Sequence, residues 1–222
     1  MRIGDQVPDF AAETSQGPIR FHEFIGESWC VLFSHPSDFT PVCTTELGAT
    51  AKLGPEWMKR GVKVIGLSVD GTAEHGRWIA DINETQQTEV NFPIIADKDR
   101  KVSMLFGMLD STTFGRTGAT VAVRSVFIIS PTKRVELVLS YPAYVGRNFD
   151  EILRVVDALQ LSAKYRVATP ANWQPGQDTV VLPFLSDAEA EEMFAEQGGF
   201  RKVRSYLRYV RDPSLRLLKS GS

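Results

Sequence analysis

One cysteine of the chain lies where a helix is expected to begin. Residues 29–33 form an apolar run typical of a buried strand, and Thr40 and Pro41 then suit the N-cap and the first position of a helix. Cys43 falls in the first turn of that helix, where unpaired backbone N–H groups and the helix dipole favour negative charge. These surroundings favour the thiolate, which is the nucleophilic form of cysteine. The pattern therefore predicts chemistry at the Cys43 sulfur.

The second cysteine has different surroundings. Cys30 lies inside the apolar run, with no cap, proline or charged residue beside it. A cysteine in such a place usually behaves as a small buried hydrophobic residue. We therefore expect Cys30 to belong to the core.

Composition limits the classes of protein that this chain can represent. It has 222 residues, 43% of them hydrophobic and 23% charged, which is typical of a globular protein. The formal net charge of −2 gives no electrostatic reason to expect nucleic acid as a partner. No apolar run approaches the roughly 18–20 residues of a membrane span, and residues 1–5 do not resemble a secretory signal. Two cysteines make no disulfide framework, so a cytoplasmic, reducing compartment is expected.

The elements that must position Cys43 follow from hydrophobic periodicity. Residues 1–28 predict a hairpin or an edge strand, and residues 110–119 predict a loop. The remaining pattern predicts, in order, strand 29–34, a helix from Pro41 to near Gly61, strand 62–70, a helix from Thr72, strand 92–96, helix 99–108, a hairpin of strands 121–129 and 135–139, and helix 149–161. Alternating strands and helices with a late hairpin predict an α/β fold, in which helices cover a mixed sheet.

Composition changes after Leu161, which predicts a domain of residues 1–165 and a small C-terminal extension, 166–222. Within the extension we expect a linker at 169–177, a short strand at 180–183, and a helix that opens with a capping box at Ser186 and Glu189 and ends near Gly198. The last segment is basic. We expect it to be a surface strand paired with the acids of 187–196 rather than a site for an anionic partner.

Several stretches of the chain resemble one family. Residues 36–43 match the Pro-x-x-x-Thr-x-x-Cys signature of the peroxiredoxins. The resemblance covers nearly the whole chain, and it is closest to the one-cysteine, peroxiredoxin-6-like branch in residues 35–48, 141–151 and 166–173. It implies a thioredoxin-like fold and a thiol-specific peroxidase that reduces hydrogen peroxide and organic hydroperoxides.

The resemblance also implies roles for single residues. Cys43 would attack the peroxide and become a sulfenic acid, the hydroxyl of Thr40 would hydrogen-bond sulfur and peroxide, and Pro36 would shield the sulfur. Arg124 matches the family's arginine that reaches the thiolate from a distant strand. Its place inside an apolar run is hard to explain as a solvated charge, and Cys43 is the natural anion for it.

Three further residues are candidates for supporting roles. Glu46 would orient an arginine, and Arg147 resembles a second arginine of the branch, although a surface charge before a helix explains it equally well. His35 resembles an active-site-adjacent histidine, with a structural hydrogen bond as the alternative. We expect no cofactor and no metal, because three histidines and two cysteines lack the spacing of metal ligands.

The expected partners follow from the cysteine count. No cysteine follows Cys43, and Cys30 lies in a predicted core strand, so an external thiol is expected to reduce the sulfenic acid. Over-oxidation to sulfinic acid is the expected liability. The resemblance further implies a homodimer, with residues 166–222 as its dimerisation domain, and a larger ring such as a decamer as the alternative.

Rival interpretations have weaker support. A thioredoxin-type oxidoreductase needs a Cys-x-x-Cys pair, which the chain lacks. Some relatives are credited with a phospholipase activity, but the element around Ser28 lacks its final glycine, and although His22 matches, Thr132 stands where that family has an aspartate. A redox-regulated chaperone or assembly subunit is the non-enzymatic alternative.

Overall fold

The computed structural model describes residues 1–114 and 120–215, with side chains described outside 110–119. The chain forms two compact units, Met1–Phe149 and Asp150–Ser222, and each is described by itself. Among the helices of these described residues, none has the length and apolar character needed to cross a membrane.

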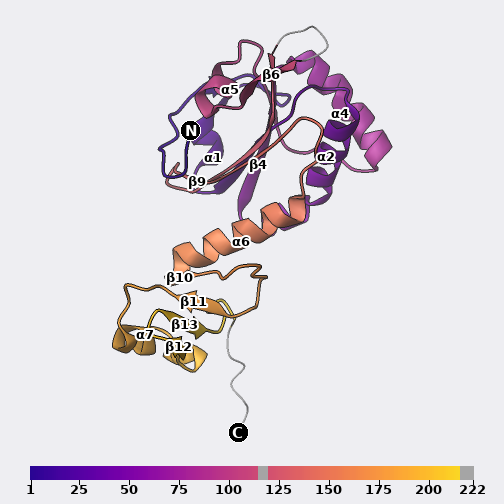
Figure 1. The fold of residues 1–222 in the computed structure, drawn as a ribbon. Coiled ribbons are helices and arrows are strands. Elements are labelled where there is room, and N and C mark those ends of the chain that lie inside the picture. The colour runs from indigo at the N-terminus through magenta and orange to yellow at the C-terminus, as the bar shows by residue number, and fades with distance from the viewer. Residues whose placement is uncertain (115–119, 216–222) are drawn as a thin grey trace. The chain divides into compact units, whose positions relative to one another are not determined.

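The first unit is built on a mixed sheet of five strands (Figure 1). In the order β5-β4-β3-β8-β9, the first three strands are parallel neighbours, whereas β8 runs antiparallel to β3 and β9 antiparallel to β8. This sheet confirms the predicted α/β fold. Its strands are β3 (Trp29–Ser34), β4 (Val62–Ser68), β5 (Ile94–Ala96), β8 (Arg124–Ile129) and β9 (Val135–Tyr141).

Helices cover both faces of this sheet. Figure 1 shows α2 (Pro41–Lys52) and α4 (Thr72–Gln86) on one side of it, and α1 (Phe21–Ile25) and α5 (Lys101–Phe106) on the other. Side chains alternate along a strand, so Cys30 joins the core cluster that includes residues of α1 and α5. On the other face of the same strand, Phe33 instead contacts the rings of Phe92 and Phe149. Cys30 is therefore a core residue, as predicted.

The single helix predicted between Pro41 and Gly61 is wrong. It is two helices, α2 and α3 (Gly54–Lys59), that meet at Leu53. Pro55 lies in the first turn of α3, because a proline lacks the N–H that a continuous helix would need there. The predicted end of the helical segment near Gly61 is confirmed, because α3 ends at Lys59. Gly61 adopts a φ of 62°, which a glycine tolerates without strain.

A second correction concerns the loop predicted at 110–119. Its first part belongs to β6 (Leu109–Phe114), which pairs antiparallel with β7 (Thr120–Ala122), while 115–119 lie outside the described residues. The adjacent strand predicted as 121–129 is also two strands, β7 and β8. The polar composition of 110–119 predicts a loop, but the β-branched threonines of this segment favour a strand once a partner strand is available. The predicted N-terminal hairpin is present as β1 (Ala11–Ala12) and β2 (Ile19–Arg20).

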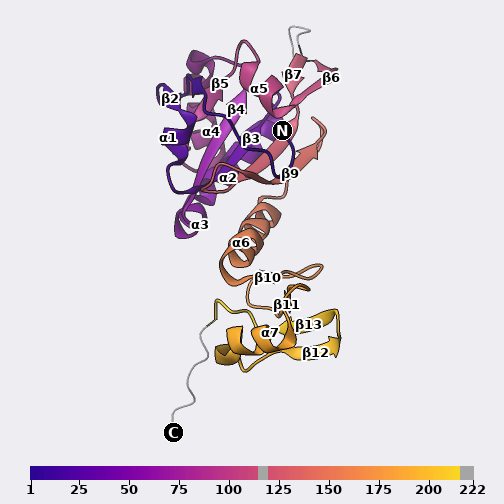
Figure 2. The ribbon, with the colours of Figure 1, turned by 90° about the vertical axis from the view of Figure 1, so that its left-hand side faces the viewer.

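The second unit has a smaller antiparallel sheet in the order β10-β11-β13-β12 (Figure 2). Its core joins residues of these strands to Trp173 and to residues of α6 and α7. The capping box at Ser186 and Glu189 and the pairing of the basic segment with Asp187 are both confirmed. The elements here are α6 (Phe149–Tyr165), which begins at the end of the first unit, β10 (Val167–Ala168), β11 (Thr179–Val181), α7 (Asp187–Met193), the 3₁₀ turn Ala195–Gln197, β12 (Arg201–Arg204) and β13 (Leu207–Val210).

Candidate active site

The start of α2 carries the candidate nucleophile. Thr40 is the N-cap residue, with φ −120° and ψ 146°, Pro41 opens the helix, and Cys43 lies buried in its first turn. The expected cap from the Thr40 side chain is not made. Its hydroxyl instead donates to the carbonyl oxygen of Ser37 at 2.9 Å, so it braces the loop before the helix. The N–H groups of the first turn consequently receive no side-chain acceptor from the cap residue.

Arg124 brings a positive charge to the Cys43 sulfur. It is the first residue of β8 and is only 3% exposed, and its Nη1 donates to Sγ of Cys43 at 3.2 Å. Two other donors of the guanidinium, Nε and Nη2, bond the carbonyl oxygen of Ala143 at 2.8 and 2.6 Å, which fixes its plane. Because this contact is buried, water screens the attraction between the cation and an ionised sulfur only weakly. The pairing of β8 with β3 thus brings together two residues that are far apart in the sequence.

Glu46 joins the two arginines of the site. Its Oε2 accepts from Arg124 Nη1 at 2.7 Å and from Arg147 Nη2 at 2.6 Å. Its Oε1 accepts from the backbone N–H and from Nε of Arg147, at 2.8 and 2.9 Å. Glu46 therefore orients both guanidinium groups in one buried cluster.

Arg147 is a buried residue rather than a surface charge. Its Nη1 donates to the carbonyl oxygens of Ser34 and Ser125, at 2.8 and 3.0 Å, which ties it to the ends of β3 and β8. The guanidinium also lies over the rings of Phe33 and Phe149, with centroid distances of 5.1 and 5.6 Å. These contacts hold Arg147 between the sheet and the start of α6.

The charges of this buried cluster do not cancel. Burial alone would raise the pKa of Glu46, but the hydrogen bonds and charge of Arg147, together with the charge of Arg124, hold that pKa below its usual range. Two guanidinium cations and one carboxylate anion leave one positive charge uncompensated. Because an unpaired buried charge is costly, the cluster favours a further anion beside Arg124.

The loop before α2 holds the remaining predicted residues. Pro36 is buried in this loop, and His35, which is also fully buried, contacts Asp38 through its Nε2, 2.8 Å from Oδ1. The other carboxylate oxygen of Asp38 lies 2.6 Å from Nδ1 of His75 in α4. Burial alone would raise the pKa of Asp38, but its bonds to His35 and His75 hold that pKa well below the usual range.

The sequence reasoning missed Asp38 and His75 as parts of the site. Asp38 occupies an unspecified position of the signature, and His75 belongs to no motif of the sequence. The spacing of His35 and Asp38 was a usable signal, but nothing in the sequence indicated that a residue of α4 would reach the same carboxylate.

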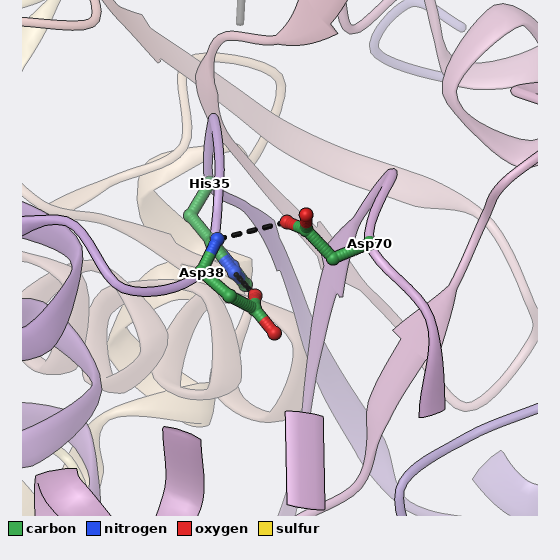
Figure 3. Close-up of side chains that lie close together, drawn as sticks. All are labelled: His35, Asp38 and Asp70. Atoms are coloured by element: carbon green, nitrogen blue, oxygen red, sulfur yellow. Dashed lines mark hydrogen bonds and ion pairs between the residues drawn. The ribbon is translucent and has the colours of Figure 1, made fainter. Parts of the chain in front are cut away.

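His35, Asp38 and Asp70 lie close enough together to share a metal ion (Figure 3). The protein's own donors already occupy these carboxylates. Asp70 Oδ2 accepts from the backbone N–H of Asp38 at 2.8 Å and from the hydroxyl of Ser68 at 3.0 Å. We therefore interpret the cluster as a hydrogen-bond network and assign no metal to it.

The residues of the hydrolase interpretation have other partners. His22 Nε2 lies 2.9 Å from the carbonyl oxygen of Val7, and the hydroxyl of Thr132 is 3.0 Å from that of Ser130. A nucleophilic serine needs a histidine within hydrogen-bond reach to take its proton, and among the described residues Ser28 makes no hydrogen bond to His22. The alternative of a phospholipase-like hydrolase is not favoured.

Comparisons with known proteins agree with this geometry. Residues 3–138 match the AhpC/TSA family, and residues 158–197 match the C-terminal domain of 1-Cys peroxiredoxin. A 1-Cys peroxiredoxin of Dictyostelium discoideum is 49% identical, covering 96% of this chain and 86% of its own. Peroxiredoxin-6 of Gallus gallus is 51% identical, in an alignment that covers 95% of this chain and 97% of the relative.

Solved structures show the same similarity. A cysteine-to-serine mutant of peroxiredoxin 6 from Arenicola marina is 43% identical, with a TM-score of 0.90 over 97% of this chain and all of its own. A yeast mitochondrial 1-Cys peroxiredoxin, studied for thiol resolution via glutathione/thioredoxin systems, is 46% identical, with a TM-score of 0.88 over 95% of this chain and 99% of its own. With a fold that matches along nearly its full length and a buried cysteine bonded to a buried arginine, the chain belongs to the one-cysteine branch of the peroxiredoxins, the thiol-dependent peroxidases.

Proposed function

We propose that Cys43 is the peroxidatic residue of this enzyme and that Arg124 keeps its sulfur ionised. The observation that carries the proposal is the 3.2 Å contact between Arg124 Nη1 and Cys43 Sγ, both of them buried. A thiolate is the form that attacks peroxides, and a fixed cation beside it stabilises the negative charge both before the reaction and in the transition state.

The peroxidase step balances with one proton from solvent. The thiolate sulfur attacks one oxygen of the peroxide, the O–O bond breaks, and the second oxygen leaves as hydroxide or alkoxide, which takes that proton to become water or an alcohol. The sulfur is oxidised to a sulfenic acid and the peroxide is reduced. Arg124 Nη1 donates to the charge that develops on the oxygens, while Glu46 and Arg147 hold the guanidinium in place.

Two loop residues complete the proposed site. The Thr40 hydroxyl donates a hydrogen bond to the carbonyl oxygen of Ser37. The lone pairs of the Thr40 oxygen are therefore available to accept a hydrogen bond from the peroxide O–H. Pro36 is buried in the same loop, where it offers no N–H donor and limits the conformations of the chain beside the sulfur. Together they would orient the peroxide for attack.

Recycling would require an external thiol. A first thiol attacks the sulfenic sulfur and releases water, and a second thiol reduces the resulting mixed disulfide. Cys30 is unsuited to this step, because it lies in the core and burial raises the pKa of its thiol. The yeast relative uses glutathione/thioredoxin systems, and we propose a reductant of the same chemical class here.

A second copy of the chain is the proposed partner at the edge of the central sheet. β9 is the outer strand, and Leu137, Val138 and Leu139 along it are only half-buried. An apolar strand edge is a template for pairing with another strand, which supports a homodimer and, through further contacts, a ring such as a decamer. Sedimentation should give a molecular mass of at least twice the 24.7 kDa of one chain. The Leu137→Lys variant should give a smaller mass than the wild type. A monomeric wild type would contradict the dimer.

The proposed compartment is the reducing cytoplasm. Both cysteines are free thiols in the structure, which suits a compartment that keeps thiols reduced. Fractionation of cells, with the chain followed by antibody, tests this placement.

The decisive experiment compares the two cysteines. Cys43→Ser should abolish consumption of hydrogen peroxide with a small-thiol donor, because no other thiolate is available in the site. Cys30→Ser is the matched control and should retain most of the activity. Turnover that survives in Cys43→Ser would overturn the assignment, and its loss in Cys30→Ser would identify Cys30 as a resolving cysteine.

A further inference from the structure

A buried serine closes the end of the ladder between β3 and β8. The register of these two strands ends at the pair of Phe33 and Val126, one residue before Ser34 on β3. At that point the side chain of Ser34 takes over. Its hydroxyl donates to the carbonyl oxygen of Val123 at 2.6 Å and accepts from the backbone N–H of Ser125 at 3.1 Å. Ser34 is fully buried, so water cannot compete for these two bonds.

The two backbone groups that Ser34 bridges lie on either side of Arg124. The carbonyl oxygen of Val123 belongs to the peptide group before Arg124, and the N–H of Ser125 belongs to the peptide group after it. Val123 lies between β7 and β8 and belongs to neither strand. A serine hydroxyl has one proton to donate and lone pairs to accept with, so it can make both bonds at once. One side chain therefore fixes both peptide groups next to the arginine.

This bridge lies at a place where the chain is otherwise weakly held. Arg124 is the first residue of β8, and the ends of an element open at a lower cost in free energy than its middle. On one side Arg124 is paired with Tyr141 of β9. The hydroxyl of Ser34 adds an anchor on the side of β3. The backbone of Arg124 is thus held from both neighbouring strands.

The position of this backbone decides where the guanidinium lies. Arg124 Nη1 is 3.2 Å from Cys43 Sγ and 2.7 Å from Glu46 Oε2, and Nε and Nη2 both bond the carbonyl oxygen of Ala143. All four contacts start from a single Cα atom. A functional group has to be held within about 0.5 Å of its working geometry. A shift of the first residue of β8 would therefore lengthen the contact with the sulfur.

The backbone of Ser34 has a separate contact with the second arginine of the site. Its carbonyl oxygen accepts from Arg147 Nη1 at 2.8 Å. Because this bond uses the main chain, an alanine at position 34 keeps the carbonyl group and removes only the hydroxyl. The bridge beside Arg124 can therefore be tested by itself.

We propose that Ser34 is a positioning residue for the peroxidase reaction and that it acts through Arg124. Its hydroxyl fixes the first residue of β8, so that the guanidinium stays within bonding distance of Cys43 Sγ. A serine with a purely structural role would stabilise the sheet without any effect on the thiolate. The proposal deepens the peroxidase function given above and rests on it.

The first test is Ser34→Ala in the full chain. Two quantities are measured: the ultraviolet absorbance of the thiolate at neutral pH, and the rate of reaction with hydrogen peroxide in a single turnover. Ser34→Ala should reduce the absorbance and slow the reaction by about tenfold, the value of one good hydrogen bond. The loss should be smaller than that of Arg124→Ala, because the guanidinium is displaced rather than removed. Wild-type absorbance and rate would overturn the proposal.

A double variant shows whether the effect passes through the arginine. In the Arg124→Ala background the guanidinium is already absent, so Ser34→Ala should slow the reaction with peroxide no further. The same tenfold loss in both backgrounds would overturn the proposal, because the serine would then act independently of Arg124.

A matched control at the other end of β8 separates positioning from general destabilisation. Ser130 directly follows that strand, and its hydroxyl lies 3.0 Å from the hydroxyl of Thr132 and 3.2 Å from the carbonyl oxygen of Arg134. Ser130→Ala should lower stability in urea while leaving the thiolate absorbance and the rate unchanged. Equal losses of absorbance in Ser34→Ala and Ser130→Ala would contradict a specific role for Ser34.

The bridge can also be observed without any substitution. Hydrogen exchange of the reduced full chain, followed by NMR, should show the N–H of Ser125 to be as slow to exchange as the N–H groups in the middle of β8. Rapid exchange at Ser125 in the wild type would contradict the bridge, whatever the stability of the variants. Failure of the peroxidase function itself would be seen separately, as a wild-type protein that consumes no peroxide.

Discussion

At the scale of single residues, charge balance around one sulfur is the central feature of this protein. Arg124 and Arg147 are both buried and share one carboxylate, Glu46. The second anion needed for neutrality is, as proposed above, a thiolate of Cys43, whose sulfur lies 3.2 Å from Arg124. Arg147 also helps to hold the ends of the central strands together, through the carbonyl oxygens of Ser34 and Ser125.

Substitution of Arg124 tests this electrostatic role. Arg124→Ala should reduce the thiolate absorbance at neutral pH and slow the reaction with hydrogen peroxide by about 10²–10³-fold, the usual effect of losing a donor to the developing charge. Arg124→Lys should be intermediate, because it keeps a cation but cannot bond Cys43, Glu46 and Ala143 together. Arg77→Ala, at an exposed ion pair, is the control and should match wild type. An unaltered thiolate absorbance in Arg124→Ala would remove this role.

The pH dependence of stability should show the contribution of Glu46. Its pKa in the folded protein lies below the unfolded value of 4.5. The contribution is therefore complete above that value and is lost as the pH falls through the folded pKa. Glu46→Gln should lower the free energy of unfolding by about 3–5 kcal/mol near pH 7, the usual cost of breaking a buried ion pair.

Urea unfolding across a range of pH values measures this effect. The gap between wild type and Glu46→Gln should stay constant from neutral pH down to about 5 and narrow below the reference value of 4.5. Glu84→Gln, on the exposed face of α4, is the control and should show no such gap. A gap that widens toward acid would contradict the assigned charge state of Glu46.

At the scale of elements, the contact between α2 and α4 positions the reactive turn. The two helices cover the same face of the sheet (Figure 1), and α4 supplies His75 and Trp78 to the loop before α2 and to its first turn. Gly48 lies on α2 where that helix meets Gln86. A Cβ atom at this position would lie 2.5 Å from Cγ and 2.6 Å from Cβ of Gln86.

Two glycine substitutions test this packing. Gly48→Ala should lower the free energy of unfolding by about 1–3 kcal/mol, because α2 and α4 must separate to admit the methyl group. Gly76→Ala is the matched control, since a Cβ there meets nothing within 4 Å. Its effect should be a stabilisation of about 0.5–1 kcal/mol, from the better helix propensity of alanine. Equal effects of both substitutions on urea unfolding would contradict the close approach.

At the scale of the whole molecule, the second unit has its own core and its own buried guanidinium. Arg208 on β13 is 3% exposed, and it donates to Asp187 at 2.9 Å and to the carbonyl oxygens of Leu182 and Leu185 at 3.0 and 2.7 Å. The guanidinium thus ties the strand to the start of α7. This unit depends on a specific polar contact as well as on Trp173 and its apolar neighbours.

Removal of that guanidinium should destabilise the second unit. Arg208→Met leaves two carbonyl oxygens without their donor and should cost about 2–3 kcal/mol of unfolding free energy. Arg204→Met, on an exposed position of β12, should change stability by less than about 0.5 kcal/mol. Calorimetry of the full chain measures both variants. An Arg208→Met protein as stable as wild type would show that the contact is dispensable.

The sequence by itself determined the class of fold and the position of the candidate nucleophile. Hydrophobic periodicity was sufficient for the central strands and the main helices, because burial imposes a regular spacing on the residues of each element. Cap and proline signals located the first turn that carries Cys43, since those preferences are local. The same local rules failed at Pro55 and at β6, where a helix break and a partner strand overrode the average pattern.

Only the tertiary structure decided which distant groups meet at that sulfur. The burial of Arg147, the joint role of Glu46 and the bond from His75 to Asp38 depend on strand register and helix packing between segments far apart in the chain. A sequence read by local rules carries no distance between such segments. The charged cluster beside Cys43, and the contacts of Asp38 with His35 and His75, therefore emerge only when the sheet and α4 are assembled.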